Sequence, residues 1–232
     1  MSRQRSIICA LSLISLCSAN ASEEIPYGIE FLAQYRSEYN YRGFILAQDT
    51  LDLQVSSQLA FNKTTYLTGA AWFGTEASDG DFSEAGFLAD LRKDIEQWTL
   101  SLSGSYRSYS NSFFENGANI EAAAFYQWNT QFQSSAHIAY DTGAEAWYSS
   151  IESSFYHRIN DDSFLNFDIG VSAVEDYYSR DGLNDAFGKI SYTYNINQSL
   201  SISPYIGTSI LLDNKESGRD SLYGGIYLAV TF

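Results

Sequence analysis

Cysteine and proline are scarce in this sequence, and long apolar runs are missing beyond its first 21 residues. The 232 residues include two cysteines and two prolines. Cys9 and Cys17 both lie in the N-terminal segment, so residues 22–232 can form no disulfide. A membrane-spanning helix needs about 20 consecutive apolar residues, and no such run follows residue 21. These absences exclude a disulfide-stabilised domain and a bundle of membrane helices.

Basic residues are few as well. The chain has 13 lysines and arginines against 28 aspartates and glutamates, a formal net charge of −15. Removal of a leader with Arg3 and Arg5 leaves 11 basic against 28 acidic residues, a charge of −17. Nucleic-acid binding depends on basic side chains that neutralise phosphates, so we expect no nucleic-acid partner.

The first 21 residues have the organisation of a secretory signal. Arg3 and Arg5 form a basic region, residues 7–16 form an apolar core too short to span a bilayer, and residues 19–21 (Ala-Asn-Ala) fit the small-residue cleavage rule. Cys17 raises the alternative of a lipoprotein, but a leucine precedes it where such a signal needs a small residue. We therefore predict a cleaved signal peptide at 1–21 and export through the inner membrane.

The last eleven residues have the pattern of a membrane β-strand. A strand period of two places one set of side chains on one face, and these are Leu222, Ile226, Leu228, Val230 and Phe232. Tyr223, Tyr227 and Thr231 share the other face. One face suits lipid and the other suits a polar lumen. The ending on Phe232 resembles the sorting signal that the barrel-assembly machinery reads in outer-membrane proteins. The predicted assembly signal comprises Tyr223, Ile226, Leu228, Val230 and Phe232.

Similar segments of about ten residues recur along the chain, separated by turn or loop clusters. We predict a single domain, 22–232, that folds as an all-β, antiparallel transmembrane β-barrel of about 12 strands, within a range of roughly 10–14. Short connections alternate with mostly longer, charged ones, as in barrels whose periplasmic turns are short. Both termini then lie on the periplasmic side.

The sequence does not decide the structure of two segments. A first strand runs from Tyr27 towards Phe44, with residues 37–40 as either a bend or a separate turn. Residues 64–74 form a strand whose outward face is undecided, because Leu67 and Phe73 compete with Tyr66 and Trp72.

A soluble β-sandwich is the alternative fold. Aromatic residues with outward parity near strand ends favour the membrane, because barrels carry aromatic girdles at both lipid interfaces. These residues are Tyr35, Trp98, Tyr106, Tyr126, Trp128, Tyr140, Trp147, Phe155 and Tyr194.

Function is expected on the inward face. The same parities place a set of charged residues in the lumen, and we predict as pore-lining Glu30, Arg36, Asp52, Asp90, Arg92, Arg107, Glu121, His137, Asp141, Glu152, Asp168 and Lys189. Small inward residues favour an open pore over an ion-pair-filled core; they are Ser101, Ser103, Ser105, Gly170, Ser172, Ser201, Ser203, Gly207, Gly225 and Ala229. An acidic excess in a narrow pore favours cations.

Catalytic and metal-binding readings find little support. Outer-membrane phospholipases use a histidine and a serine two residues apart, and neither His137 nor His157 has a serine two residues after it. His137 beside Glu121 and Asp141 could hold a metal or act as a base, but a hydrogen-bonded lumen side chain is favoured. The loop 79–81 (Asp-Gly-Asp) lacks further calcium ligands. We therefore expect no enzyme, no cofactor and no metal.

One local segment resembles a known family. Residues 39–44 (Tyr-Asn-Tyr-Arg-Gly-Phe), followed by Gln48-Asp49 and a strand from Leu51, resemble the Tyr-x-x-Arg-Gly segment in the first hairpin of the TorF-like porin family. Its members are exported, tyrosine-rich β-barrels of similar length with no established substrate. The resemblance implies that Arg42 points into the lumen and pairs with a neighbouring acidic residue.

These features together predict a barrel in the cell outer membrane. We expect a porin for passive diffusion of small hydrophilic solutes, with a mild preference for cations. Its expected partners are outer-membrane lipids, the barrel-assembly machinery and small solutes. The alternatives are a structural or surface-interaction barrel with a blocked lumen, or an outer-membrane lipid hydrolase.

Overall fold

The computed structural model describes residues 27–78, 80–213 and 218–232. The predicted signal peptide, its cleavage site and Asp79 of the weak calcium motif lie outside the described residues. The strands, listed in chain order, are β1 (Tyr27–Tyr41), β2 (Phe44–Asn62), β3 (Thr65–Glu76), β4 (Ser83–Ile95), β5 (Trp98–Ser110), β6 (Gly117–Gln127), β7 (Phe132–Asp141), β8 (Ala146–Arg158), β9 (Ser163–Tyr177), β10 (Arg180–Asn195), β11 (Leu200–Leu211) and β12 (Ser221–Thr231).

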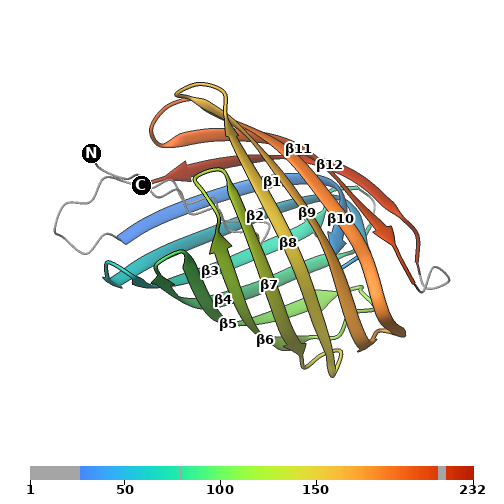
Figure 1. The fold of residues 1–232 in the computed structure, drawn as a ribbon. Helices are drawn as coiled ribbons and strands as arrows, with labels where there is room; N and C mark the ends of the chain where they lie inside the picture. Colours follow the sequence, from blue (N-terminus) through green and yellow to red (C-terminus); the bar gives the residue numbers. More distant parts are fainter. Residues whose placement is uncertain (1–26, 79, 214–217) are drawn as a thin grey trace.

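The strands form one closed barrel (Figure 1). Each strand pairs antiparallel with its sequence neighbours, and β1 pairs with β12 from Glu30↔Thr231 to Arg36↔Gly225 to complete the ring. Each of the twelve described strands has a ladder partner on both sides within the wall, and such closure is what a hydrocarbon environment requires. The predicted all-β antiparallel barrel of about twelve strands is confirmed. Among the described residues, no helix is long and apolar enough to cross a membrane.

The barrel is apolar outside and polar inside. Leu53, Ile151 and Ile169 are each 64% exposed on the outer surface, whereas Thr50 and Ser172 on the inner surface are almost completely buried. A soluble sandwich would bury its large apolar side chains, so this inversion fits a barrel surrounded by lipid.

The structure settles the facing of β3. Tyr66 and Thr68 are buried on the lumen side, and Phe73 is 51% exposed on the outer side. Trp72 therefore shares the inward parity of Tyr66, and Leu67 shares the outward parity of Phe73.

The two ends of the barrel differ. We call the end where β1 begins and β12 ends the terminal end, and the opposite end the loop end. Four of the five turns at the terminal end contain an asparagine whose side-chain oxygen accepts the backbone N–H two residues later; these are Asn62, Asn129, Asn160 and Asn197. Such Asx turns are local structures that sequence alone specifies.

The loop end departs from the expected long connections at two places. The first strand does not reach Phe44, because Arg42 and Gly43 form a two-residue turn with φ values of 51° and 78°. Such paired positive φ values are typical of tight hairpin turns. β9 and β10 are likewise joined by Tyr178 and Ser179 alone, at an end where longer connections were expected.

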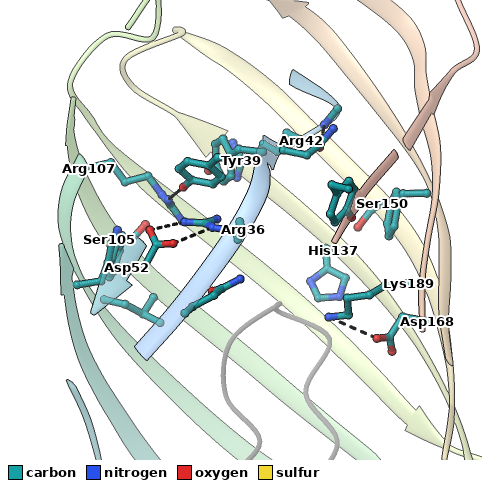
Figure 2. A pocket seen from close by; sticks show the side chains of 18 of the residues that line it. Arg36, Tyr39, Arg42, Asp52, Ser105, Arg107, His137, Ser150, Asp168 and Lys189 are labelled. Atoms are coloured by element: carbon teal, nitrogen blue, oxygen red, sulfur yellow. Dashed lines mark hydrogen bonds and ion pairs between the residues drawn. The ribbon is translucent and has the colours of Figure 1, made fainter. Parts of the chain in front are cut away.

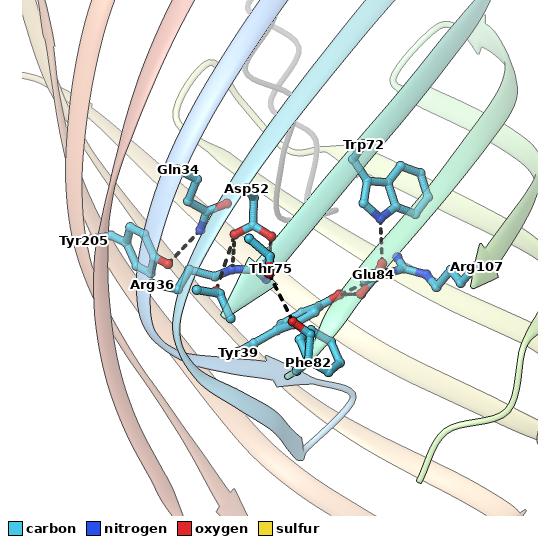
Figure 3. A network of polar contacts seen from close by, with 11 residues as sticks. Gln34, Arg36, Tyr39, Asp52, Trp72, Thr75, Phe82, Glu84, Arg107 and Tyr205 are labelled. Atoms are coloured by element: carbon cyan, nitrogen blue, oxygen red, sulfur yellow. Dashed lines mark hydrogen bonds and ion pairs between the residues drawn. The ribbon is translucent and has the colours of Figure 1, made fainter. Parts of the chain in front are cut away.

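The tip of the first hairpin leaves the barrel wall. The ladder between β1 and β12 ends at Arg36, and the ladder between β2 and β3 ends at Thr50. Residues 37–49, here called the inward hairpin, pair with one another beyond those points and carry a bulge between Tyr39 and Asn40. Asp49 has a positive φ of 48° where the hairpin bends, and Figure 3 shows the hairpin curving away from the wall.

Candidate functional site

A polar cavity of about 290 Å³ occupies the lumen beside the inward hairpin (Figure 2). Nine of the thirteen predicted lumen residues line it, and these are Arg36, Arg42, Asp52, Arg107, Glu121, His137, Glu152, Asp168 and Lys189. The other four predicted residues, Glu30, Asp90, Arg92 and Asp141, are buried in the lumen but do not line the cavity. Whether any of them contacts a permeating solute stays a prediction.

Arg42, at the tip of the inward hairpin, reaches the opposite wall of the barrel. Its Nη2 donates to Asn119 Oδ1 on β6 at 2.8 Å, and its Nη1 donates to Tyr177 OH on β9 at 3.0 Å. Nη1 also lies 3.3 Å from the Asp141 carboxylate on β7. The guanidinium carbon lies 4.6 Å from the ring centre of Tyr148 on β8. Four strands of the far wall therefore hold this single side chain.

The backbone of the tip is held as well. Asn184 Nδ2 donates to the Arg42 carbonyl at 2.9 Å, and Arg180 Nη1 donates to the Gly43 carbonyl at 3.1 Å. The next residue, Phe44, is 4% exposed in an apolar cluster with Phe114 and Tyr177. These contacts seat the tip between two connections of the loop end.

A second network holds the base of the inward hairpin (Figure 3). Glu84 on β4 is 2% exposed and accepts hydrogen bonds from Tyr39 OH at 2.5 Å, Trp72 Nε1 at 2.5 Å and Arg107 Nη1 at 2.6 Å. Tyr39 also lies under the Arg36 guanidinium, 3.6 Å from ring centre to guanidinium carbon. One buried carboxylate thus joins the hairpin to β3, β4 and β5.

The cavity wall away from the hairpin is rich in carboxylates. His137 Nδ1 lies 3.1 Å from Glu121 Oε1, and its Nε2 lies 4.0 Å from Glu152 Oε1. Lys189 Nζ lies 3.6 Å from the Asp168 carboxylate. Two glutamates therefore share one histidine, which leaves this side with an acidic excess. Within the described part of the chain, no group of three or more His, Cys, Asp or Glu residues is arranged to hold a metal ion.

His137 also contacts a serine that the sequence analysis did not consider. Its Nε2 lies 3.0 Å from Ser135 Oγ, on the ring side opposite Glu121. This order of serine, histidine and carboxylate is that of a nucleophile with its base. Ser135, however, sits within β7 with ladder partners on both β6 and β8, so its backbone N–H belongs to the sheet rather than to an oxyanion hole. The cluster is best explained as hydrogen bonding within the wall. A search for serine two residues before histidine would have found it.

Small inward residues do not leave the space expected of them. A methyl group at Gly207 would lie 2.6 Å from the Tyr223 ring, and one at Gly225 would lie 2.6 Å from Tyr205 OH. The ring of Phe187 covers Gly170 in the same way. Aromatic rings from adjacent strands fill these positions, so the argument that glycines open the lumen is wrong at these sites.

Below the cavity, towards the terminal end, the lumen is packed more closely. Asp90 accepts hydrogen bonds from Arg92 Nε at 2.5 Å and from Ser101 Oγ at 2.6 Å. The Arg92 guanidinium lies 5.2 Å from the ring centre of Phe125, which is 2% exposed. The cavity thus lies between this packed layer and the inward hairpin.

Known structures share this architecture at very low sequence identity. A KdgM porin has 8% identity and a TM-score of 0.57, with 88% of this chain and 99% of that chain covered. The COG4313 outer membrane channel from Pseudomonas putida F1 has 7% identity and a TM-score of 0.56, with 93% and 100% covered. A NanC porin has 11% identity and a TM-score of 0.54, with 87% and 98% covered. These likenesses establish a porin-like barrel fold.

No family model and no curated protein sequence matches the chain. Membership of the TorF-like porin family therefore stays a prediction from residues 39–44. The three solved structures named above are two porins and an outer membrane channel, and at 7–11% identity they show the shared fold alone.

Proposed function

We propose that this protein is an outer-membrane channel for passive diffusion of small hydrophilic solutes, with a mild preference for cations. The observation that carries the proposal is the polar cavity inside a barrel with an apolar exterior. Six carboxylates and four arginines or lysines line that cavity, a formal charge of −2. Fixed negative charge in a narrow passage raises the local concentration of cations and repels anions.

The proposal includes the route to the membrane. A cleaved leader at residues 1–21 would direct export, and the final strand ending on Phe232 would be recognised by the barrel-assembly machinery. The exposed apolar belt, with residues such as Leu222 at 70% exposure, would contact outer-membrane lipids. The terminal end would then face the periplasm, and the inward hairpin would lie near the outer mouth. Membership of the TorF-like porin family is part of this proposal.

Conductance of the refolded protein in planar lipid bilayers tests the channel. We expect ion conductance and a reversal potential in a salt gradient that indicates more permeation by cations than by anions. The double variant Glu121→Gln/Glu152→Gln should shift the reversal potential towards equal permeation, because both carboxylates line the cavity. Glu175→Gln, at an exposed position near the end of β9, is the matched control and should leave selectivity unchanged.

A barrel with a closed lumen is the second candidate, and the inward hairpin favours it. The tip crosses the lumen, and aromatic rings fill the glycine gaps. If this candidate is correct, neither the wild-type protein nor Arg42→Ala, which removes the side-chain contacts of the hairpin tip, will conduct. Absence of conductance in both proteins would overturn the channel proposal.

A further inference from the structure

The far wall of the barrel contains a fully formed guanidinium site. Asp141 supplies a carboxylate, Asn119 supplies a carbonyl oxygen at 2.8 Å, and Tyr177 supplies a hydroxyl oxygen at 3.0 Å. The Tyr148 ring adds a π-face to the guanidinium at 4.6 Å. Acceptors arranged around a planar cation and an aromatic face are the features that select guanidinium over a compact ammonium group.

The residues that form this site are held in place by contacts other than those with Arg42. Tyr177 OH donates to Asp141 Oδ2 at 2.8 Å, and Asp141 Oδ1 accepts the backbone N–H of Gly143 at 2.9 Å. Asn119 lies on β6 and Tyr148 lies on β8, and each of these strands is paired with its neighbours in the wall. Tyr177 and Asp141 therefore keep hydrogen-bond partners when the cation leaves, and the strand ladders hold the backbone of Asn119 and Tyr148 in place.

The occupant, by contrast, stands on a segment that has no ladder to the strands on either side of it. Arg42 is at the tip of the inward hairpin, beyond the points where β1 and β2 pair with their outer neighbours. Segments held by side-chain contacts rather than by ladders on both sides open at lower free energy than the wall. The guanidinium site belongs to the barrel wall, whereas Arg42, which fills it, belongs to a hairpin outside the wall ladders.

We propose that this site also binds small solutes that carry a guanidinium group, and that such a solute displaces Arg42 and releases the inward hairpin from the mouth. The release step rests on the proposed channel function, whereas the binding step does not. Because Arg42 is tethered, and because Asn184, Arg180 and the Phe44 cluster also hold its hairpin, it competes at an effective concentration of at least about millimolar. A free solute must reach a similar concentration to compete.

Binding can be measured directly once the tethered competitor is removed. Arg42→Ala should bind methylguanidinium chloride in isothermal titration of the refolded full chain in detergent. Arg42→Ala/Asp141→Asn should bind it at least about tenfold more weakly, because the charged acceptor is lost. Equal affinity of the two variants, or no binding to Arg42→Ala, would overturn the proposal. Methylammonium chloride serves as the control cation and should bind Arg42→Ala more weakly than methylguanidinium.

Release of the hairpin has its own readout in planar bilayers. Millimolar methylguanidinium should raise the wild-type conductance above that in sodium chloride of equal ionic strength. A Phe44→Cys/Ala146→Cys variant, cross-linked by a short bismaleimide that alkylates both thiols, should lose this response, because both positions belong to one cluster between the tip and β8. A response that persists after cross-linking would contradict release. If no variant conducts, the channel proposal fails and the titration alone decides whether the site binds guanidinium.

Discussion

The two ends of this barrel are held together by different kinds of contact. At the terminal end, the turn asparagines bond to backbone groups two residues away, as Asn129 does with Gln131. At the loop end, the contacts of the inward hairpin join residues far apart in the chain, such as Arg42 and Asn184, which are separated by 142 positions. One end is closed by local turn chemistry and the other by contacts across the lumen.

This difference has a thermodynamic meaning. A local turn costs little chain entropy to close and contributes little when it forms. Contacts across the barrel can form after the strands are in place, and they include buried charges whose loss is costly. The terminal end should therefore tolerate substitution, whereas the loop end should not.

The largest expected effect comes from the buried carboxylate at the base of the inward hairpin. Glu84→Gln removes the charge that pairs with Arg107 at 2.6 Å and accepts from Tyr39 and Trp72. Because it leaves a largely buried arginine without its counter-ion, we expect a loss of about 3–5 kcal/mol in the free energy of unfolding. Urea unfolding of the refolded protein, followed by tryptophan fluorescence, measures this loss.

The matched control lies at the terminal end. Arg158 and Asp161 form an ion pair at 2.6 Å, but the Asp161 side chain is 94% exposed. Water already screens that pair, so Asp161→Asn should leave the unfolding midpoint unchanged. Equal losses in Glu84→Gln and Asp161→Asn would mean that the two ends do not differ in the way we infer.

The same contrast explains which features the sequence could predict. Period-two alternation predicted the inward facing of residues such as Glu121 and Lys189, because strand parity follows from local geometry. The alternation of short and longer connections predicted short turns at one end, and the turn at Asn62 is one of those at the terminal end. The facing of β3 stayed undecided because apolar and aromatic residues occur on both of its faces, and pairing with β2 and β4 fixes the choice.

The inward hairpin was beyond sequence reasoning for a physical reason. The segment 37–49 includes a possible bend at residues 37–40 and an unbroken apolar run at residues 44–47, but nothing in this pattern shows that it leaves the wall. Its position depends on Asp141 and Asn119, which lie 99 and 77 positions away from Arg42. The resemblance of residues 39–44 to a family segment implied a lumen-facing Arg42 paired with an acid, but not which acid, nor that it would come from the opposite wall.

An intermediate effect is expected where a ring fills a glycine gap near the loop end. In Gly207→Ala, the new methyl group would meet the Tyr223 ring at 2.6 Å. The ring must move in a packed lumen, so we expect a loss of about 1–3 kcal/mol in the free energy of unfolding. Gly104→Ala is the control, since nothing lies within 4 Å of a methyl group there. If both variants unfold at the same urea concentration, ring packing does not stabilise the loop-end half.

The smallest effect should come from a turn of the terminal end. Asn129 Oδ1 accepts the backbone N–H groups of Gln131 at 2.8 Å and Phe132 at 3.0 Å. Asn129→Ala removes both acceptors, but water can replace them at this exposed turn, so the loss should be about 1 kcal/mol or less. Asn129→Asp keeps an acceptor and should preserve stability. Because the turn lies at the opposite end of the barrel from the inward hairpin, conductance should also remain at the wild-type level in planar bilayers. A conductance change in Asn129→Ala as large as that in Arg42→Ala would show that the two ends are coupled through the strands between them.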